Sequence, residues 1–253
     1  MVRPKKHLGQ HFLNDPNIAR KIAALASDAE HVCELGPGTG VLTRYLLESK
    51  NLQKLVLVEI DDESIDYLKL HFSEAKMNII QADFLKTDLS VLFKNSFSLI
   101  GNFPYNISSQ IFFKVLEQKE LVDEVICMIQ KEVADRIVSP PGNKTYGILS
   151  VLLQAWFNIE YCFTVNENVF IPPPKVKSAV IKLCRIKDNK INCNEALFFR
   201  VVKTAFNQRR KTLRNALRSL LPFDFSEIPY LDKRAEQLNK FQFAELSNAL
   251  TDD

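Results

Sequence analysis

The stretch HVCELGPGTGVLTRYLLE, residues 31–48, passes from an apolar run through a glycine-rich loop into a helical pattern. Its first five residues predict a strand, residues 36–40 a loop and residues 41–48 a helix. In an open α/β sheet, ligands bind just beyond the carboxyl ends of the strands, where this loop would lie. Glycines in the loop would let the backbone approach such a ligand closely. The stretch therefore predicts the first unit of a ligand-binding α/β fold.

The same alternation of strands and helices continues to about residue 130. Further strands are predicted at residues 54–59, 77–81, 97–100 and 124–129, and helices at residues 62–72 and 108–116. An earlier helix begins at Pro16, with Asp15 as its cap. Apolar strands that alternate with helices predict a parallel sheet covered on both faces. Residues 159–165 and 178–185 alternate in polarity and predict a final antiparallel pair.

The pattern changes after Lys187, where strand-like runs end. Residues 194–206, 209–220 and 240–250 read as helices, with prolines in the gaps between them. We therefore expect two domains: an α/β domain over residues 1–187 and a small helical domain over residues 188–253.

Composition excludes several classes of protein. The chain has 253 residues, of which 46% are hydrophobic and 25% charged, as in ordinary folded domains. No apolar run approaches the roughly 20 residues that span a bilayer, and the first 14 residues lack the apolar core of a secretory signal. The five cysteines are odd in number and contain no CxxC pair, which disfavours a disulfide framework or a zinc site. We expect a cytoplasmic protein without a metal.

The net charge of +3 is unevenly distributed along the chain. Residues 1–14 carry three basic side chains and no acidic one, and residues 203–218 carry six and none, which leaves −6 for the rest. One basic run is usually a solvated helix face, but two on an otherwise acidic chain indicate a polyanionic partner, most simply a nucleic acid.

The glycine loop and two later strand ends fit a nucleoside cofactor. The loop reads G-x-G-x-G, and Val41 stands where the dinucleotide fingerprint has its third glycine. Glu59 ends the next strand, 23 residues after Gly36, and could accept hydrogen bonds from a ribose diol. Asp83 follows the strand after that and could accept from an adenine amino group. Since the dinucleotide spacing is absent, S-adenosyl-L-methionine is the expected cofactor.

The fourth strand end carries the turn Asn102-Phe103-Pro104-Tyr105. An exocyclic amine such as adenine N6 is a poor nucleophile because its lone pair is delocalised into the ring. Acceptors from the Asn102 side chain and the Pro104 carbonyl would hold its two N–H groups and favour a reactive geometry. Tyr105 offers a face on which a flipped base could stack. An isolated turn of this kind is often only structural, but its place in this series of strand ends favours a catalytic role.

Several motifs together resemble a known family. They are residues 9–15 (GQHFLND), 34–40, 58–61 (VEID), 81–83, 101–109, 170–180 and 206–211 (FNQRRK). The chain resembles the ribosomal RNA adenine dimethyltransferases of the KsgA type from about residue 8 to residue 250. The resemblance implies a class I, Rossmann-like methyltransferase fold with a small C-terminal helical domain. It also implies that four methyl groups go from S-adenosyl-L-methionine to the N6 atoms of two adjacent adenines. These adenines lie in the 3′-terminal hairpin of 16S rRNA, in a pre-assembled small ribosomal subunit.

The resemblance also implies roles for individual residues. The cofactor contacts fall on His11, Leu13, Gly36, Glu59, Asp83 and Asn102. The target adenine would be held by Asn102, Pro104 and Tyr105, with Phe170 closing over it from the other side. The rRNA phosphates would meet Arg209, Arg210, Lys211, Arg214 and Arg218.

Two residues depart from the family pattern. Phe103 stands where leucine is usual, but its side chain need not face the base, so we expect activity to survive. His11 stands where asparagine is frequent, and both types can hydrogen-bond. Nothing in the sequence indicates an obligate dimer, so a monomer is expected.

Three alternatives remain at this point. A resistance methyltransferase that modifies one adenine of large-subunit rRNA would share the cofactor loop and the NxPY turn. A non-enzymatic assembly or transcription factor could keep the fold, although the intact Glu59, Asp83, Asn102 and Tyr105 argue against lost chemistry. A dinucleotide oxidoreductase is disfavoured by the glycine spacing.

Overall fold

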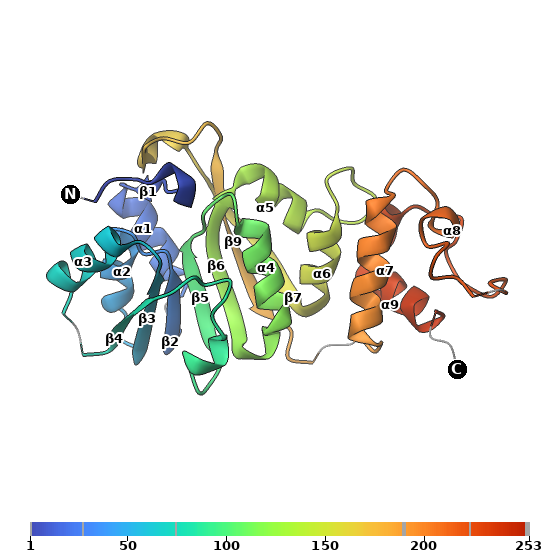
Figure 1. Ribbon diagram of the computed structural model, residues 1–253, viewed down its shortest axis with the longest axis horizontal. Coiled ribbons are helices and arrows are strands. Elements are labelled where there is room, and N and C mark those ends of the chain that lie inside the picture. The colour runs from blue at the N-terminus through green and yellow to red at the C-terminus, as the bar shows by residue number, and fades with distance from the viewer. Residues whose placement is uncertain (1, 27, 74, 189–190, 223, 251–253) are drawn as a thin grey trace. The chain divides into compact units, whose positions relative to one another are not determined.

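The computed structural model describes residues 2–26, 28–73, 75–188, 191–222 and 224–250, and the chain divides into two compact units (Figure 1). The first unit comprises Met1–Ala134 and Ile159–Arg185, and the second Asp135–Asn158 and Ile186–Asp253. The domain boundary expected at residue 187 stays a prediction. The second unit also takes in residues 135–158, because helix α6 (Ile148–Trp156) packs against helix α7 (Glu195–Asn207) through the rings of Trp156 and Phe198, 5.6 Å apart.

The first unit is built on a sheet of seven strands among the described residues, in the order β4-β3-β2-β5-β6-β9-β7. Its strands are β2 (His31–Leu35), β3 (Lys54–Glu59), β4 (Met77–Gln81), β5 (Phe97–Asn102), β6 (Val122–Gln130), β7 (Phe157–Val165) and β9 (Ser178–Arg185). The five strands from β4 to β6 run parallel, and β9 is antiparallel to β6. A separate two-stranded ribbon pairs β1 (Phe12–Leu13) with β8 (Phe170–Ile171). The predicted parallel sheet and its antiparallel edge are confirmed.

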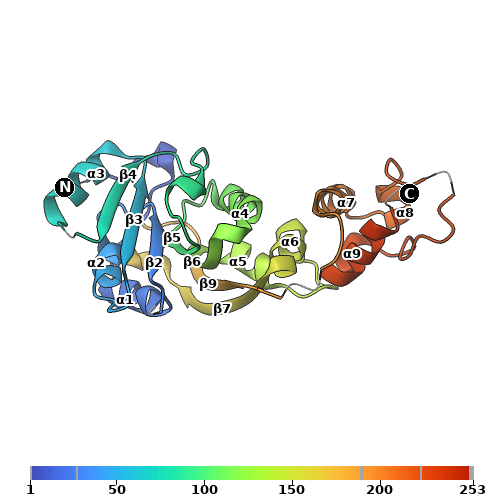
Figure 2. The same cartoon turned by 90° about the horizontal axis from the view of Figure 1, so that it is seen from below.

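Helices connect the strands and make up most of the second unit. They are α1 (Pro16–Ala24), α2 (Val41–Leu47), α3 (Asp62–His71), α4 (Ser108–Glu117), α5 (Lys131–Val138), α6, α7, α8 (Leu213–Ala216) and α9 (Lys240–Asn248). Short 3-10 turns occupy Lys6–Leu8, Leu89–Val91, Lys119–Leu121, Glu167–Val169 and Ala235–Gln237. In Figure 2, α1 and α2 lie on one face of the sheet and α4 on the other. None of the helices in the described residues is long and apolar enough to cross a bilayer.

Burial on both faces explains why the central strands are apolar along their whole length. Leu55, Val56 and Leu57 of β3 are fully buried, although they point alternately to opposite faces of the sheet. Charged or polar residues end two of the central strands, Glu59 in β3 and Asn102 in β5. The sequence pattern of these two strands thus also marks where ligand-binding side chains can lie.

The strand order reverses between β2 and β5, and the backbones approach each other closely there. At Gly101, an added Cβ would collide with the carbonyl oxygen of Leu35 in β2. Only glycine fits this position without moving one of the two strands. This close approach brings the glycine loop after β2 beside the NFPY turn after β5, at the switch point where open α/β sheets bind ligands.

Glu34 joins β2 to α2 beneath the glycine loop. Its carboxyl group is 1% exposed, and its Oε2 accepts a hydrogen bond from the hydroxyl of Thr43 at 2.7 Å. Burial raises the pKa of Glu34 to about 8, and the Thr43 hydrogen bond only partly opposes this rise. At neutral pH the folded protein therefore holds a proton on Glu34 that the unfolded chain releases.

The second unit has an aromatic core formed by α6, α7 and α9, and the last two lie side by side (Figure 1). Phe206 of α7 contacts Phe243 of α9, with ring centroids 6.0 Å apart. The helix expected over residues 209–220 is wrong in extent, because only Leu213–Ala216 is α-helical. The N–H of Leu213 donates to the carbonyl of Lys233 at 2.7 Å, so this segment uses a distant acceptor where a continuous helix would use a local one.

Replacing Glu34 with glutamine tests its buried proton. The amide of the new side chain can still accept from Thr43 but cannot ionise. In the wild type, stability should fall between pH 4.5, the ordinary pKa, and about 8, because over this range only the unfolded chain ionises. The loss is at most about 1.4 kcal/mol per pH unit. Glu34→Gln should therefore gain stability relative to wild type up to about pH 8 and hold a constant difference above it, as urea unfolding from pH 5 to 9 would show.

The matched control is Glu48→Gln at the exposed end of α2. It should show no comparable trend. A stability difference for Glu34→Gln that stays constant over the whole pH range would contradict the buried proton.

Candidate active site

A cavity of about 270 Å³ lies at the carboxyl ends of the parallel strands. Its walls are residues 7–12, 35, 36, 38, 58–60, 82–85 and 102–107, which come from the N-terminal segment and from the ends of β2, β3, β4 and β5. Among the residues that the sequence singled out, those lining it are His11, Gly36, Glu59, Asp83, Asn102, Pro104 and Tyr105. The fold therefore brings most of the predicted cofactor and base contacts into one cavity.

The glycine loop takes a shape that other residues would strain. Gly36, Gly38 and Gly40 have φ angles of 63°, 56° and 72°, in the left-handed region. The N–H of Gly36 donates to the carbonyl of Val58 at 2.9 Å, which ties the loop to β3. A Cβ at Gly38 would lie 2.8 Å from the ring of Phe12. The loop is thus packed tightly on one side and presents bare backbone to the cavity.

Glu59 is 5% exposed and is held by three backbone donors. The N–H of Gly38 donates to Oε2 at 3.1 Å, and those of Ile60 and Asp61 donate to Oε1 at 2.8 and 3.0 Å. Burial raises the pKa of this carboxyl group above its ordinary value, and the three hydrogen bonds oppose the rise. Oε1 accepts two of these bonds and Oε2 one, so Oε2 keeps acceptor capacity and is placed to accept from a ligand hydroxyl.

Asp83 follows β4 and is half-buried. Its Oδ1 accepts from the N–H of Leu85 at 3.0 Å, and its Oδ2 lies 3.5 Å from Nζ of Lys86. The neighbouring Phe84 is 3% exposed and contributes to both the core and the cavity wall. Asp83 is therefore placed to accept from a ligand beside an apolar surface.

Asn102 at the end of β5 is bonded to the N-terminal segment. Its Nδ2 donates to the carbonyl oxygen of His11 at 2.8 Å. Because the amide nitrogen is engaged in this way, the orientation of the amide is fixed and Oδ1 keeps its acceptor capacity for a ligand in the cavity.

The two residues after Asn102 fix the turn. Phe103 donates its N–H to the carbonyl of Met128 at 3.0 Å, and its side chain is 1% exposed. Its ring packs edge-on against Phe112 with centroids 6.0 Å apart, as expected for a side chain directed into the core. The carbonyl of Pro104 accepts from the N–H of Ile107 at 3.2 Å and retains a second lone pair.

Tyr105 is anchored at both its ring and its hydroxyl. The ring stacks on that of His11, with centroids 5.5 Å apart and an interplanar angle of 24°. The hydroxyl shares a 2.5 Å hydrogen bond with Oγ of Ser178, which is fully buried at the start of β9. Burial raises the pKa of Tyr105, and the bond to Ser178 opposes the rise. Sequence reasoning assigned no role to Ser178, although it stands in the quoted motif of residues 170–180.

Leu13 and Phe170 lie outside this cavity wall. They face each other in the β1–β8 ribbon and are 8% and 2% exposed within the hydrophobic core. Nearby, the Nδ1 of His11 lies 2.7 Å from the carbonyl oxygen of Pro172. This contact joins the N-terminal segment to the loop after β8. Direct contact of Leu13 or Phe170 with a ligand stays a prediction.

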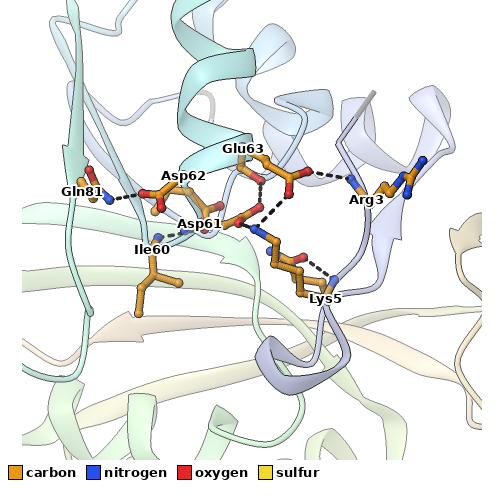
Figure 3. Close-up of polar contacts among 10 residues, drawn as sticks. Arg3, Lys5, Ile60, Asp61, Asp62, Glu63 and Gln81 are labelled. Atoms are coloured by element: carbon orange, nitrogen blue, oxygen red, sulfur yellow. Dashed lines mark hydrogen bonds and ion pairs between the residues drawn. The ribbon is translucent and has the colours of Figure 1, made fainter.

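The N-terminal segment is fastened beside Glu59 by an ion-pair cluster (Figure 3). Lys5 contacts the buried carboxylate of Asp61, and its Nζ is 3.3 Å from Oε1 of Glu63. Asp61 also accepts from Ser64 at 2.8 Å. Burial raises the pKa of Asp61, but the hydrogen bonds from Lys5 and Ser64 outweigh this and lower it overall. The cluster holds residues 7–12 in place as one wall of the cavity.

The predicted RNA-binding cations lie in the second unit, and they are not equivalent. Arg209 is half-buried, with Nε 2.9 Å from Glu236 and a further bond to the carbonyl of Lys144. The exposed ones are Arg210, Lys211, Arg214 and Arg218. Since Arg210 and Arg218 lie outside α8, these two and Arg214 do not share one helical face.

In the described parts of the chain, no three His, Cys, Asp or Glu side chains are grouped closely enough to hold a metal ion.

Comparisons with known proteins agree on one family. Residues 1–252 match the sequence family described as ribosomal RNA adenine dimethylase. A protein named ribosomal RNA small subunit methyltransferase A from Parabacteroides distasonis is 56% identical, over 98% of this chain and 94% of that protein. Its namesake from Cytophaga hutchinsonii is 54% identical, over 99% and 98%.

Solved structures show the same architecture. A dimethyladenosine transferase from Plasmodium falciparum superposes with a TM-score of 0.80 at 26% identity, covering 93% of this chain and 96% of that one. The 23S rRNA methyltransferase ErmE has a TM-score of 0.68 at 24% identity, over 94% and 99%, which shows a shared fold. The chain therefore has the class I, Rossmann-like methyltransferase fold and belongs to the ribosomal RNA adenine dimethylase family.

Proposed function

We propose that this protein dimethylates the N6 atoms of two adjacent adenines in the 3′-terminal hairpin of 16S rRNA, using S-adenosyl-L-methionine, during ribosome biogenesis. The observation that carries the proposal is the Asn102–His11 hydrogen bond, which leaves the Asn102 Oδ1 free to accept from an amine in the cavity. We further propose that the protein acts in the cytoplasm as a monomer, on a pre-assembled small subunit.

The residues of the cavity fit S-adenosyl-L-methionine, which would supply an electrophilic methyl group. Glu59 is oriented by three N–H donors and would accept from the ribose through its Oε2. Asp83 would accept from the adenine amino group of the cofactor. The bare backbone of Gly36 and Gly38 allows the remainder of the cofactor to approach closely.

The NFPY turn would bind and orient the target amine. Asn102 Oδ1 and the second lone pair of the Pro104 carbonyl would accept its two N–H groups. Two such acceptors draw the nitrogen lone pair out of conjugation with the ring and aim it at the methyl donor. After the first transfer one N–H remains, so one acceptor can still hold the monomethylated amine for the second.

Tyr105 would hold the ring of the target base. One face of its ring is covered by His11, so the base would stack on the other. Because the hydroxyl is bonded to Ser178, the ring is oriented before the base arrives. Phe170, which is buried in the β1–β8 ribbon, would have to leave its place in the core to close over the base from the other side.

The relatives favour the small subunit over the large one. Proteins that are 51–56% identical across nearly the whole chain carry the name ribosomal RNA small subunit methyltransferase A. The large-subunit enzyme ErmE shares 24% identity, which supports a common fold only. A non-enzymatic factor is disfavoured because Glu59 and Asn102 are held ready by hydrogen bonds that structural packing alone would not require.

Asn102→Ala should abolish base positioning while leaving the fold intact. Loss of one well-placed polar contact to the reacting group typically lowers turnover about 100- to 1,000-fold. The measurement is mass spectrometry of rRNA after incubation with labelled S-adenosyl-L-methionine and unmethylated small subunits. Wild type should add two methyl groups to each of two adjacent adenines.

The control is Asn78→Ala, the same change at an exposed position of β4. It should behave as wild type. Full dimethylation by Asn102→Ala would contradict the role of the amide. Methylation of naked large-subunit rRNA by the wild type, without methylation of small subunits, would favour the alternative substrate.

Cofactor affinity should depend on the ionisation of Glu59. Because the pKa of Glu59 is raised, its carboxyl group takes up a proton at a higher pH than an ordinary glutamate. The ionised carboxylate accepts from a ribose hydroxyl more strongly than the neutral acid, so affinity should fall as the pH is lowered through this pKa. Calorimetry from pH 8 to 5 should show the fall in wild type and weak, nearly pH-independent binding in Glu59→Gln. Parallel pH profiles for the two proteins would rule out this role.

The exposed cations of the second unit should give RNA binding its dependence on salt. The triple replacement of Arg210, Arg214 and Arg218 by alanine should weaken binding to small subunits. It should also reduce the slope of log affinity against log salt concentration by about 2 to 3. Replacing Lys50, Lys69 and Lys94, which are exposed in the first unit, removes the same charge as a control. Equal slopes for the two triple variants would contradict phosphate contact by the second unit.

A further inference from the structure

A second, larger cavity lies in the first unit outside the proposed active site. Its volume is about 480 Å³, within the range of small-ligand pockets. It is formed by residues 2–4, 12–14, 16, 39–41, 44, 45, 67 and 171. Of the residues assigned above to the cofactor and the target base, Leu13 alone lines this cavity, and its side chain carries no polar group.

The charge of this cavity is entirely positive. Arg3 and Arg44 are the charged residues among those lining it, and both are exposed. Within the described part of the chain, neither guanidinium forms an ion pair with a carboxylate. Two uncompensated guanidinium groups at one cavity attract a phosphate, which arginine binds through paired N–H donors.

Aromatic rings supply a surface of the kind on which bases stack. Tyr45 of α2 and Tyr67 of α3 line the cavity and are half-buried. Tyr67 stacks on His71 with centroids 3.9 Å apart, and the guanidinium of Arg20 lies 5.1 Å from the centre of the Tyr45 ring. Because these partners hold the rings, stacking a base on them would cost little further side-chain entropy.

The ion-pair cluster of Lys5 places Arg3 at this cavity. The backbone N–H of Arg3 is 3.5 Å from Oε2 of Glu63, while its side chain lines the cavity. Figure 3 shows the guanidinium of Arg3 directed away from the acidic group around Asp61. In the N-terminal segment, Lys5 therefore fixes the segment to the acidic group, while Arg3 is available to a ligand.

One residue separates this cavity from the proposed active site. Phe12 lines both, and its partner in the ribbon, Ile171, lines the second cavity and is 53% exposed. Ile171 directly follows Phe170, the residue expected near the target base. A strand that delivers a base to the active site would thus pass close to the second cavity.

We propose that this cavity binds one nucleotide of the RNA substrate other than the target adenine. Its phosphate lies between Arg3 and Arg44, and its base packs against Tyr45 and Tyr67. No carboxylate lines the cavity among the described residues, so no negative charge there repels the phosphate. The subsite serves to hold the strand in register. This inference rests on the proposed function, since it takes RNA as the substrate.

The test is charge reversal at Arg44, which lies outside the cofactor cavity. Arg44→Glu should raise the KM for small subunits about tenfold or more, the effect of losing one charge-assisted phosphate contact. It should leave kcat and the affinity for S-adenosyl-L-methionine unchanged. Lys50→Glu, an exposed residue just beyond the same helix and outside the cavity, is the matched control. Arg3→Ala provides a second variant at the cavity. It removes an exposed side chain whose loss should not disturb folding.

Direct binding separates this inference from the proposed function. A mixed-sequence single-stranded RNA, followed by fluorescence anisotropy, should bind the wild type and Lys50→Glu alike and bind Arg44→Glu and Arg3→Ala more weakly. Equal binding by all four proteins, or an unchanged KM in Arg44→Glu, would overturn the subsite. Failure of the wild type to methylate any rRNA would instead contradict the proposed function, whatever the binding result.

Discussion

The hydrogen bond from the Asn102 side chain to the carbonyl of His11 is the interaction on which the site depends. It joins the end of β5 to the N-terminal segment, 91 residues away in the sequence. It also decides which end of the amide meets the ligand, because an amide that donates through nitrogen to the backbone offers only oxygen to the cavity. A rotated amide would present two N–H groups to an amine and repel it. The direction of this one hydrogen bond thus decides whether the turn can accept from the amine of a target base.

The rest of the first unit holds the two partners of that bond in position. Asn102 is placed by the close approach of β5 to β2, which requires glycine at Gly101. His11 is placed by the Lys5–Asp61 cluster on one side and by its contact with Pro172 on the other. The same cluster lies two residues from Glu59, so cofactor and base contacts share one support.

The sequence allowed much of this to be predicted, for a physical reason. Parallel strands buried on both faces are largely apolar, so polar residues at their carboxyl ends, such as Glu59 and Asn102, stand out in the sequence. Features that depend on contacts between residues far apart in the sequence were either missed or predicted wrongly. Ser178 gains its role only by meeting Tyr105, and the helix expected from residue 209 is interrupted because Leu213 bonds to Lys233. Contacts between residues so far apart in the sequence leave no periodic pattern from which they could be predicted.

A high-resolution structure of the protein with S-adenosylhomocysteine and a short adenine-containing RNA would test the central claim directly. The account predicts that the target N6 lies about 2.7–3.2 Å from Oδ1 of Asn102, while Nδ2 still donates to the carbonyl of His11. The account would be contradicted by an amide turned the other way, or by an adenine whose N6 is held by acceptors outside the NFPY turn.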